Sequence, residues 1–330
     1  MSLLPEFQLL RPASAKEAVR LHAEHPDSRY LAGGTDLLPN LRRGLVATDV
    51  LIDLGGLAEL AELREETGVL RMGTGVSLAA LAAHRLVREG LPALAQAALG
   101  VAGPTHRVAA TLGGNLCLET RCRFYNQSEC WREANDFCLK LGSEVCRVAT
   151  QSPRCYAAFS GDLAPALMVL QAELEVMGPE GSRRVPISQF YLEDGKAWLD
   201  LAPDELLVAV RVPLEPGWVS AYEKVRVRAS LDFPLAGVAV ALQRQGDRVT
   251  DLRVALTGVS SRPEGVEGLA GLLGQSLNEA SLAILARQVK VATKAMGTTL
   301  VGVPYRRHIA PVLAKRLVER LWSASSGVGA

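Results

Sequence analysis

Six cysteines carry the most distinctive chemistry in this chain. They are confined to one part of the 330 residues and are Cys117, Cys122, Cys130, Cys138, Cys146 and Cys155. A disulfide framework would normally be spread through a small secreted domain. Thiolates are also ligands of zinc and of iron–sulfur clusters. The clustering therefore predicts a bound metal centre.

The segment between residues 117 and 155 is polar and arginine-rich, and it has neither a helical nor a strand period. We expect a long irregular loop, which a compact domain keeps only for a reason such as a metal centre. A structural zinc site favours closely spaced cysteine pairs, and no pair here is closer than Cys117 and Cys122. Zinc, disulfides and unliganded thiols are the alternatives to an iron–sulfur cluster.

Two glycine pairs form a second candidate site. One lies in the motif Leu31-Ala-Gly-Gly-Thr-Asp36, after a predicted strand, and the other in Thr111-Leu-Gly-Gly-Asn-Leu116, at a strand-like junction. Adjacent glycines let the backbone turn tightly and present N–H groups to an anion. Thr35 and Asp36 either contact a ligand or cap the next turn. Neither motif has the Rossmann G-x-G-x-x-G spacing, so each alone also fits an ordinary turn. Together they are consistent with a clamp on a dinucleotide diphosphate.

Short helices and strands surround these motifs. Ser14, followed by Glu17, predicts a helix start, and Gly178–Gly181 predicts a hairpin turn. A boundary near residues 213–217 precedes a strand-then-helix layout, which is typical of an α+β unit. The expected strands are residues 29–32, 50–54, 70–72, 221–228, 236–244 and 249–257. The expected helices include residues 77–86, 91–101, 279–296 and 305–322.

Composition excludes several classes of function. Lys+Arg is 36 and Asp+Glu is 35, so a net charge of +1 gives no reason to expect nucleic acid or an anionic membrane as partner. The apolar runs are too short to span a bilayer, and the N-terminus lacks a signal-peptide pattern, which predicts a cytoplasmic protein. The five histidines are scattered, and neither a Ser/His/Asp arrangement nor H-E-x-x-H occurs. We therefore assign no catalytic residue to this chain.

Five segments in order resemble the FAD-binding subunits of molybdenum hydroxylases. They are AGGTDLLPNLRRG (32–44), GPTHRVAATLGGNLC (103–117), GDLAPALMVLQAELEV (161–176), KVRVRASLDFPLAGVAVAL (224–242) and TTLVGVPYRRHIAPVLAKRLVERL (298–321). The resemblance implies an α+β fold. An FAD-binding domain of the vanillyl-alcohol-oxidase type would span residues 1–216, with subdomains 1–57 and 58–216. A C-terminal domain of the carbon monoxide dehydrogenase flavoprotein type would span 217–330.

The same resemblance implies a set of FAD contacts. The first loop would hold the diphosphate mostly through backbone N–H groups, the second loop would contact the other face of FAD, and two further residues would approach the cofactor. In that order, these residues are Leu31, Ala32, Gly33, Gly34, Thr35 and Asp36; Thr111, Gly114 and Asn115; and Asp162 and Lys224. Asp162 could instead cap the next helix, and Lys224 could be a solvated strand residue. His106 and Val108 replace the family's usual glutamine and asparagine, so no contact is assigned to them.

The cysteine segment resembles one branch of this family. The strings RCRFYNQSECWR, FCLK and RCYA are similar to the FAD subunit of 4-hydroxybenzoyl-CoA reductase, which carries a [4Fe-4S] cluster in this insertion. Such a cluster takes four thiolates. Cysteine at position 117 also occurs in relatives without the insertion, and Cys130 replaces an aromatic residue of the branch. The resemblance thus implies Cys122, Cys138, Cys146 and Cys155 as ligands. Arginines at 121, 123 and 132 either offset the cluster charge or face solvent.

The expected function is electron transfer within a hetero-oligomer. FAD and the [4Fe-4S] cluster would connect reduced ferredoxin with the [2Fe-2S] small subunit and the molybdopterin-containing large subunit. The expected reaction is reductive dehydroxylation of 4-hydroxybenzoyl-CoA to benzoyl-CoA. One alternative is a molybdenum hydroxylase for another aromatic or N-heterocyclic substrate, and another is a non-catalytic scaffold subunit stabilised by zinc.

Overall fold

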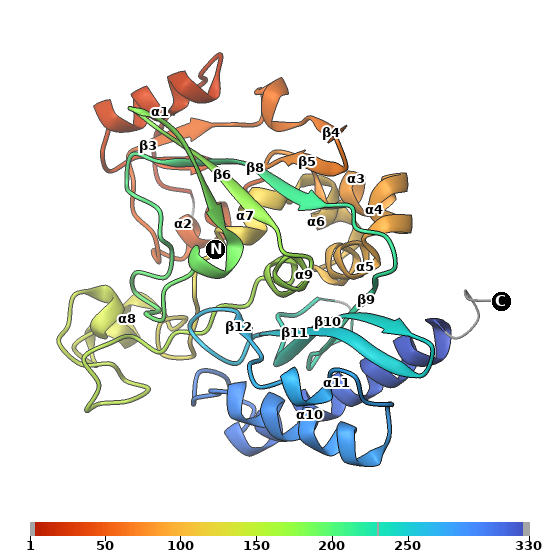
Figure 1. Ribbon diagram of the computed structural model, residues 1–330. Helices are drawn as coiled ribbons and strands as arrows, with labels where there is room; N and C mark the ends of the chain where they lie inside the picture. The colour runs from red at the N-terminus through yellow and green to blue at the C-terminus, as the bar shows by residue number, and fades with distance from the viewer. Residues whose placement is uncertain (1–3, 230, 326–330) are drawn as a thin grey trace.

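The computed structural model describes residues 4–229 and 231–325, arranged around three β-sheets (Figure 1). The N-terminal sheet has the strand order β1-β3-β2, the central sheet β4-β5-β8-β6-β7, and the C-terminal sheet β12-β11-β10-β9. Helices pack against these sheets, which gives the mixed architecture predicted from the sequence. Among the described helices, none is both long enough and apolar enough to cross a bilayer.

The N-terminal sheet is parallel and positions the first glycine pair. Its strands are β1 (Gln8–Leu10), β2 (Arg29–Leu31) and β3 (Val50–Asp53). Helix α1 (Ala15–Glu24) begins as predicted, because the Ser14 hydroxyl accepts a 3.1 Å hydrogen bond from the Glu17 N–H. The first glycine pair directly follows β2, and helix α2 (Leu37–Arg42) comes next. The motif is therefore held between a strand and a helix.

The central sheet is antiparallel and supplies the largest core. Its inner face packs with helices α3, α5 and α9, through side chains such as Met72, Leu94 and Leu167. The predicted hairpin at Gly178–Gly181 joins β6 to β7. The strands are β4 (Leu63–Glu66), β5 (Val69–Gly73), β6 (Glu173–Gly178), β7 (Gly181–Pro186) and β8 (Leu206–Pro213). The helices are α3 (Leu78–Ala83), α4 (Arg85–Gly90), α5 (Pro92–Gly100), α6 (Pro104–Ala109), α7 (Leu112–Leu116) and α9 (Leu163–Val169).

Two local predictions are wrong in this region. The helix expected at residues 77–86 ends at Ala83, because His84 is extended (φ −65°, ψ 132°), and α4 begins after it. The second glycine pair lies inside α7, although Thr111 at the start of its motif forms an isolated β-bridge with Ser77. Thr111 is extended and caps this short helix through its hydroxyl, so the cap overrides the low helix propensity of glycine.

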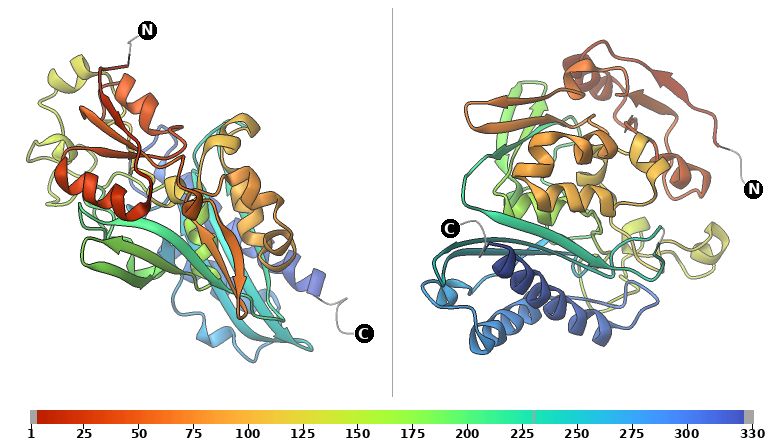
Figure 2. Two further views of the ribbon diagram at one scale, coloured as in Figure 1. Left: turned by 90° about the horizontal axis from the view of Figure 1, so that it is seen from above. Right: turned by 90° about the vertical axis from the view of Figure 1, so that its right-hand side faces the viewer.

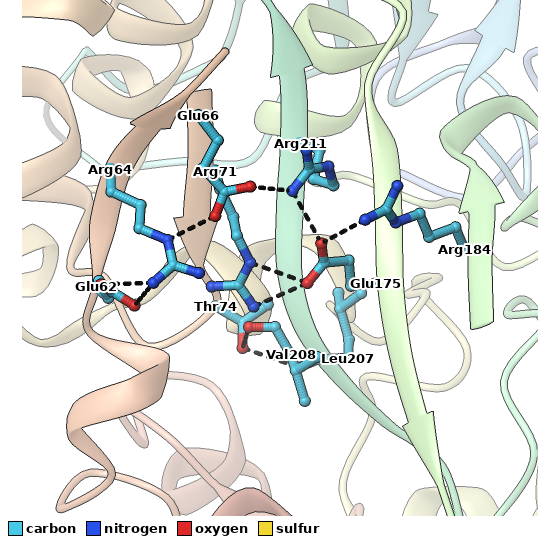
Figure 3. A network of polar contacts seen from close by, with 10 residues as sticks. All are labelled: Glu62, Arg64, Glu66, Arg71, Thr74, Glu175, Arg184, Leu207, Val208 and Arg211. Atoms are coloured by element: carbon cyan, nitrogen blue, oxygen red, sulfur yellow. Dashed lines mark hydrogen bonds and ion pairs between the residues drawn. The ribbon is translucent and has the colours of Figure 1, made fainter. Parts of the chain in front are cut away.

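The outer face of the central sheet is divided between two kinds of contact. At one end Leu206 and Val208 pack against residues of α1 and β3. At the other end cross-strand ion pairs link β4, β5, β6 and β8 (Figure 3). Glu175 accepts from Arg71 at 2.8 Å and from Arg211 at 3.3 Å, and these three side chains are 14–16% exposed. Pairing of opposite charges across partly buried strands favours a single strand register.

The C-terminal sheet is buried on both faces. Along β10, Val238 and Val240 contribute to a core with α10 and α11, whereas Ala239 and Ala241 join the core of the central sheet. Figure 2 shows α10 and α11 on one side of these strands and α5 on the other. The elements are β9 (Val219–Val225), β10 (Ala236–Gln245), β11 (Arg248–Thr257), β12 (Glu264–Gly265), α10 (Glu279–Ala292) and α11 (Val303–Ser325).

The cysteine segment is a long loop at the edge of the molecule, as predicted, at the lower left of Figure 1. It contains only helix α8 (Glu129–Glu133) and a 3-10 turn (Leu139–Leu141). Its polar groups anchor it to the chain around α2: Arg132 Nη2 donates to the Gly44 carbonyl at 2.9 Å, and the Tyr125 hydroxyl donates to the Leu45 carbonyl at 3.1 Å. The loop therefore has a defined position beside the first glycine motif.

Candidate functional site

A cavity of about 1020 Å³ brings the two glycine motifs together. Its wall includes every residue predicted to contact FAD except Leu31 and Lys224, so segments far apart in the sequence meet at one site. A cavity of this size is at the upper end of the range for cofactor sites. Its wall also includes Cys117.

The first glycine motif has free hydrogen-bond donors. Gly34 has φ +67°, a conformation that favours glycine, and a Cβ on Gly33 would lie 1.9 Å from the carbonyl oxygen of Ala109. Among the described residues, no acceptor is found for the backbone N–H groups of Gly33, Gly34, Thr35 and Asp36. Unpaired N–H groups in a cavity wall suit an anionic ligand, and this fits the diphosphate of FAD.

The second glycine motif does not offer free N–H groups, which a clamp on the diphosphate from both sides would need. Its N–H groups are used inside the protein: Leu112 donates to Val76 at 2.9 Å, Gly113 to Thr74 at 2.8 Å, and Gly114 to the Thr111 hydroxyl at 3.1 Å. Only the first loop therefore presents its backbone donors to an anion. The second loop forms part of the cavity wall, where glycine keeps the backbone close to a ligand.

Asp36 is engaged with its neighbours and does not cap α2. Its carboxylate accepts hydrogen bonds from Asn40 Nδ2 at 2.9 Å and from Arg121 Nη2 at 3.0 Å. Arg121 is also 3.3 Å from Glu119. The cysteine loop thus reaches the first glycine motif through an ion pair, so the two candidate sites are joined by direct contacts.

Asp162 and Lys224 form a buried ion pair next to the cavity. Lys224 Nζ lies 2.8 Å from Asp162 Oδ1, and the Tyr222 hydroxyl donates to the same oxygen at 2.6 Å. Burial raises the pKa of Asp162, and Lys224 opposes that shift. Asp162 does not cap α9, and the Lys224 side chain is only 5% exposed, so neither alternative from the sequence holds. Asp162 lines the cavity. Lys224 is not part of the cavity wall and contacts Asp162.

The four cysteines that the resemblance implies as ligands are also the four that are buried. Exposed fractions are 6% for Cys122, 8% for Cys138, and 4% for both Cys146 and Cys155. Cys130 is exposed on α8, and Cys117 packs against the central core instead, where burial raises its thiol pKa to about 12. None of the six forms a disulfide.

The four buried thiols interact with one another. Cys146 and Cys155 share a hydrogen bond, which lowers the pKa of Cys146 to about 5 and raises that of Cys155. Burial raises the pKa of Cys122, and the charges of Cys138 and Cys146 raise it further. The Tyr125 N–H donates to Cys122 Sγ at 3.3 Å, and the Ala157 N–H donates to Cys155 Sγ at 3.4 Å. Such bonds are also found around iron–sulfur clusters.

The described residues offer no site for a single metal ion. In the described part of the chain, no three Cys, His, Asp or Glu side chains converge on a point that could hold one ion. A tetrahedral zinc site needs four ligands around one centre.

Several cavity residues carry no sequence signal. Tyr30, Trp198, Tyr125 and Lys140 line the cavity without belonging to either glycine motif. The Tyr30 hydroxyl and Trp198 Nε1 are buried and lack a partner among the described residues, so both are available to a bound ligand. Only Tyr125 and Lys140 could have been suspected, because they lie in the cysteine segment.

Known proteins share this sequence and architecture. The family model "FAD binding domain in molybdopterin dehydrogenase" matches residues 5–215, and "CO dehydrogenase flavoprotein C-terminal domain" matches residues 220–321. The aldehyde oxidoreductase FAD-binding subunit PaoB of Escherichia coli (strain K12) is 34% identical over 82% of this chain and 86% of its own length. The carbon monoxide dehydrogenase medium chain of Afipia carboxidovorans is 29% identical over 95% and 96%, respectively.

Among solved structures, the carbon monoxide dehydrogenase of Hydrogenophaga pseudoflava that lacks the Mo-pyranopterin moiety superposes with a TM-score of 0.80 at 26% identity. The match covers 97% of this chain and 99% of the other. The family models, the sequence identities and the fold agree with the cavity built from the two glycine motifs. The chain therefore belongs to the family of FAD-binding subunits of molybdenum hydroxylases.

Proposed function

We propose that this chain transfers electrons through two cofactors, FAD and a [4Fe-4S] cluster. The observation that carries the proposal is the burial of Cys122, Cys138, Cys146 and Cys155 as one interacting group beside the FAD cavity. A flavin exchanges one or two electrons, and an iron–sulfur cluster exchanges one. A subunit holding both can therefore connect a one-electron carrier to two-electron substrate chemistry elsewhere.

The residues of this chain bind and orient these groups. The free N–H groups of the Gly33–Asp36 loop would hold the FAD diphosphate, and Thr111, Gly114, Asn115 and Asp162 would line the remaining cavity. The Asn115 side chain accepts a 3.0 Å hydrogen bond from the Leu163 N–H, which fixes α7 against α9. Leu31 and Lys224 would act indirectly, by positioning the loop and Asp162. We infer no proton transfer by any residue of this chain.

The substrate would be bound by partner subunits. Relatives of this chain are named medium chains or FAD-binding subunits, so we propose a large molybdenum-cofactor subunit and a small [2Fe-2S] subunit as partners. Reduced ferredoxin is the proposed electron donor. The unpaired cysteines are consistent with the predicted cytoplasmic location.

The proposed reaction is the reductive dehydroxylation of 4-hydroxybenzoyl-CoA. Two electrons and two protons enter, the phenolic oxygen leaves as water, and benzoyl-CoA is formed. The support for this substrate is the resemblance of the cysteine segment, whose four expected ligands are the four buried thiols. The substrate is therefore proposed from the loop that is distinctive of one branch of the family.

A second candidate is aldehyde oxidation, because the relative with 34% identity is named an aldehyde oxidoreductase subunit. N-heterocycles are a third, since one relative is named nicotine 6-hydroxylase. A zinc-stabilised scaffold would lack flavin and iron altogether.

Isolation of the native complex distinguishes these candidates. We expect one FAD, four iron and four sulfide per chain beyond the partners' clusters, and benzoyl-CoA formation with a low-potential reductant. Turnover of aldehydes or N-heterocycles without benzoyl-CoA formation would reject the named substrate and keep the two-cofactor assignment. A colourless chain that contains zinc but no flavin would reject both.

A further inference from the structure

Lys140 is a buried cation at an unusual position. It follows the proposed ligand Cys138 by two residues, in the 3-10 turn Leu139–Leu141, and its side chain is 5% exposed. Its ammonium group donates to the Thr120 hydroxyl at 2.6 Å and to the Gly195 carbonyl at 2.8 Å, and it lies 3.4 Å from Glu119 Oε1. Burying an ammonium group costs several kcal/mol unless charges or dipoles compensate, so its enclosure calls for an explanation.

The same side chain lies in the wall between the two cofactor sites. Lys140 lines the FAD cavity, and its Nζ lies 5.1 Å from the ring centroid of Tyr125 and 4.6 Å from that of Trp198, two other residues of that wall. The Tyr125 N–H donates to Cys122 Sγ at 3.3 Å, and Gly195, whose carbonyl accepts from Lys140, donates its N–H to the Cys155 carbonyl at 2.9 Å. One charge is therefore close to both sites.

The loop around Lys140 buries more positive than negative charge. Arg121 is 9% and Arg132 is 4% exposed, and Glu119 and Asp36 are the acids that face this group of cations. Arg121 Nη1 and Arg132 Nε are buried without a hydrogen-bond partner among the described residues. An excess of buried cations favours an anionic group nearby, and a thiolate-ligated iron–sulfur cluster supplies one.

We propose that Lys140 would raise the reduction potential of the [4Fe-4S] cluster by stabilising the negative charge that one-electron reduction adds to the cluster. This inference rests on the proposed function, because it requires the cluster. Glu119 opposes Lys140, so the potential reflects the balance between this carboxylate and the ammonium group. The two residues act through the field at the cluster and not by contact with substrate.

The test is a dithionite-mediated redox titration of the assembled enzyme, followed by the EPR signal of the reduced cluster, with iron, sulfide and FAD quantified for each variant. In Lys140→Met we expect the ratio of reduced to oxidised cluster at a fixed potential to fall at least tenfold, a shift of about 59 mV for one electron. Glu119→Gln should shift the potential in the opposite direction. Arg123→Met is the matched control, because it removes an exposed cation next to Cys122 that solvent screens.

Opposite shifts in Lys140→Met and Glu119→Gln, with an unchanged Arg123→Met, would support the inference. A full cluster in Lys140→Met with an unchanged potential would overturn it while leaving the proposed function intact. If Lys140→Met cannot hold the cluster, the upward shift in Glu119→Gln decides, and its absence would overturn the inference. Wild-type protein without iron and sulfide would overturn the proposed function and this inference with it.

Discussion

Burial separates the cysteines of this chain into two groups at the scale of single residues. Cys122, Cys138, Cys146 and Cys155 are enclosed and interact, whereas Cys130 is exposed and Cys117 belongs to another core. The sequence predicted these ligands only through a resemblance, because spacing alone left six candidates. The structure adds an independent observation, since the four thiols that the resemblance implies as ligands are the four buried ones.

Cysteine substitutions test this grouping directly. We expect Cys138→Ser to lower the iron content strongly while most FAD is retained, because Cys138 does not line the FAD cavity. Cys130→Ser should keep both cofactors, since its side chain lies on the exposed surface of α8. Iron, sulfide and flavin are measured on the purified variants. Loss of the cluster in Cys130→Ser would show that the ligand set is wrong.

The Asp162–Lys224 pair makes a second prediction at this scale. Lys224→Met leaves a buried carboxylate whose remaining hydrogen-bond partner among the described residues is the Tyr222 hydroxyl, so we expect the free energy of unfolding to fall by about 3–5 kcal/mol. In Asp162→Asn/Lys224→Met neither charge of the pair remains, so part of this loss should be recovered. Urea unfolding followed by circular dichroism measures both. A loss below about 1 kcal/mol in Lys224→Met would mean that water reaches the pair.

At the scale of elements, capping and turn residues predicted some helices and strands, whereas others are determined by burial in the folded chain. Helix α1 could be predicted from Ser14, and the expected strands 236–244 and 249–257 match β10 and β11, which join through Gly246, whose φ is +61°. Strand β8, at the centre of the middle sheet, was missed. Its residues are apolar on both faces, because α1 covers one end of the outer face. The strand therefore lacks the alternation of apolar and polar residues that would predict it.

The residues of the candidate site also divide into those that the sequence predicts and those that only the fold shows. The glycine motifs and cysteines have recognisable residue types at short spacing, and the sequence identified them. Tyr30 and Trp198 reach the cavity from separate elements, and only the folded chain brings them beside the glycine motifs. Nothing local in the sequence could show that the N–H groups of the second glycine motif are used by Val76 and Thr74.

The contact between the first glycine motif and α6 gives a prediction at this scale. In Gly33→Ala the new methyl group would overlap the Ala109 carbonyl, so the loop must move away from α6. Overpacking of this kind costs about 1–3 kcal/mol, and each 1.4 kcal/mol is a tenfold change in affinity, so we expect FAD to bind about tenfold more weakly or worse. Gly56→Ala is the control, because a methyl group at that position would have no atom of another described residue, apart from its chain neighbours, within 4 Å.

Flavin fluorescence titration of the two apo-proteins measures this difference. Equal FAD affinity in Gly33→Ala and wild type would contradict the close approach of the loop to α6. A similar loss in Gly56→Ala would instead indicate a general sensitivity of glycine turns.

At the scale of the whole molecule, the two family matches share the core of the central sheet, whereas the core beneath α10 and α11 is built from the second match alone. The predicted boundary near residue 216 lies between them, and the domain division stays a prediction. Ala239, Ala241 and Ala255 of the C-terminal sheet pack into the core of the central sheet. Asp162 and Lys224 join the same two parts through a buried ion pair. We therefore expect the two matched regions to fold as one unit.

Calorimetry can test this cooperativity. The apo-chain should show a single unfolding transition, because the C-terminal sheet would lose the cover of α5 and α9 if either part unfolded alone. FAD binds only the folded cavity, so it should raise the midpoint of that whole transition by mass action, about 2.7 kcal/mol of stabilisation at 100 times the dissociation constant. A chain ending at residue 216 is the control and should lack this cooperative transition, since Tyr222 and Ala239 no longer complete its core. Two transitions in the full chain, with FAD shifting only one of them, would instead mean that the matched regions unfold independently and that the shared core contributes little to their coupling.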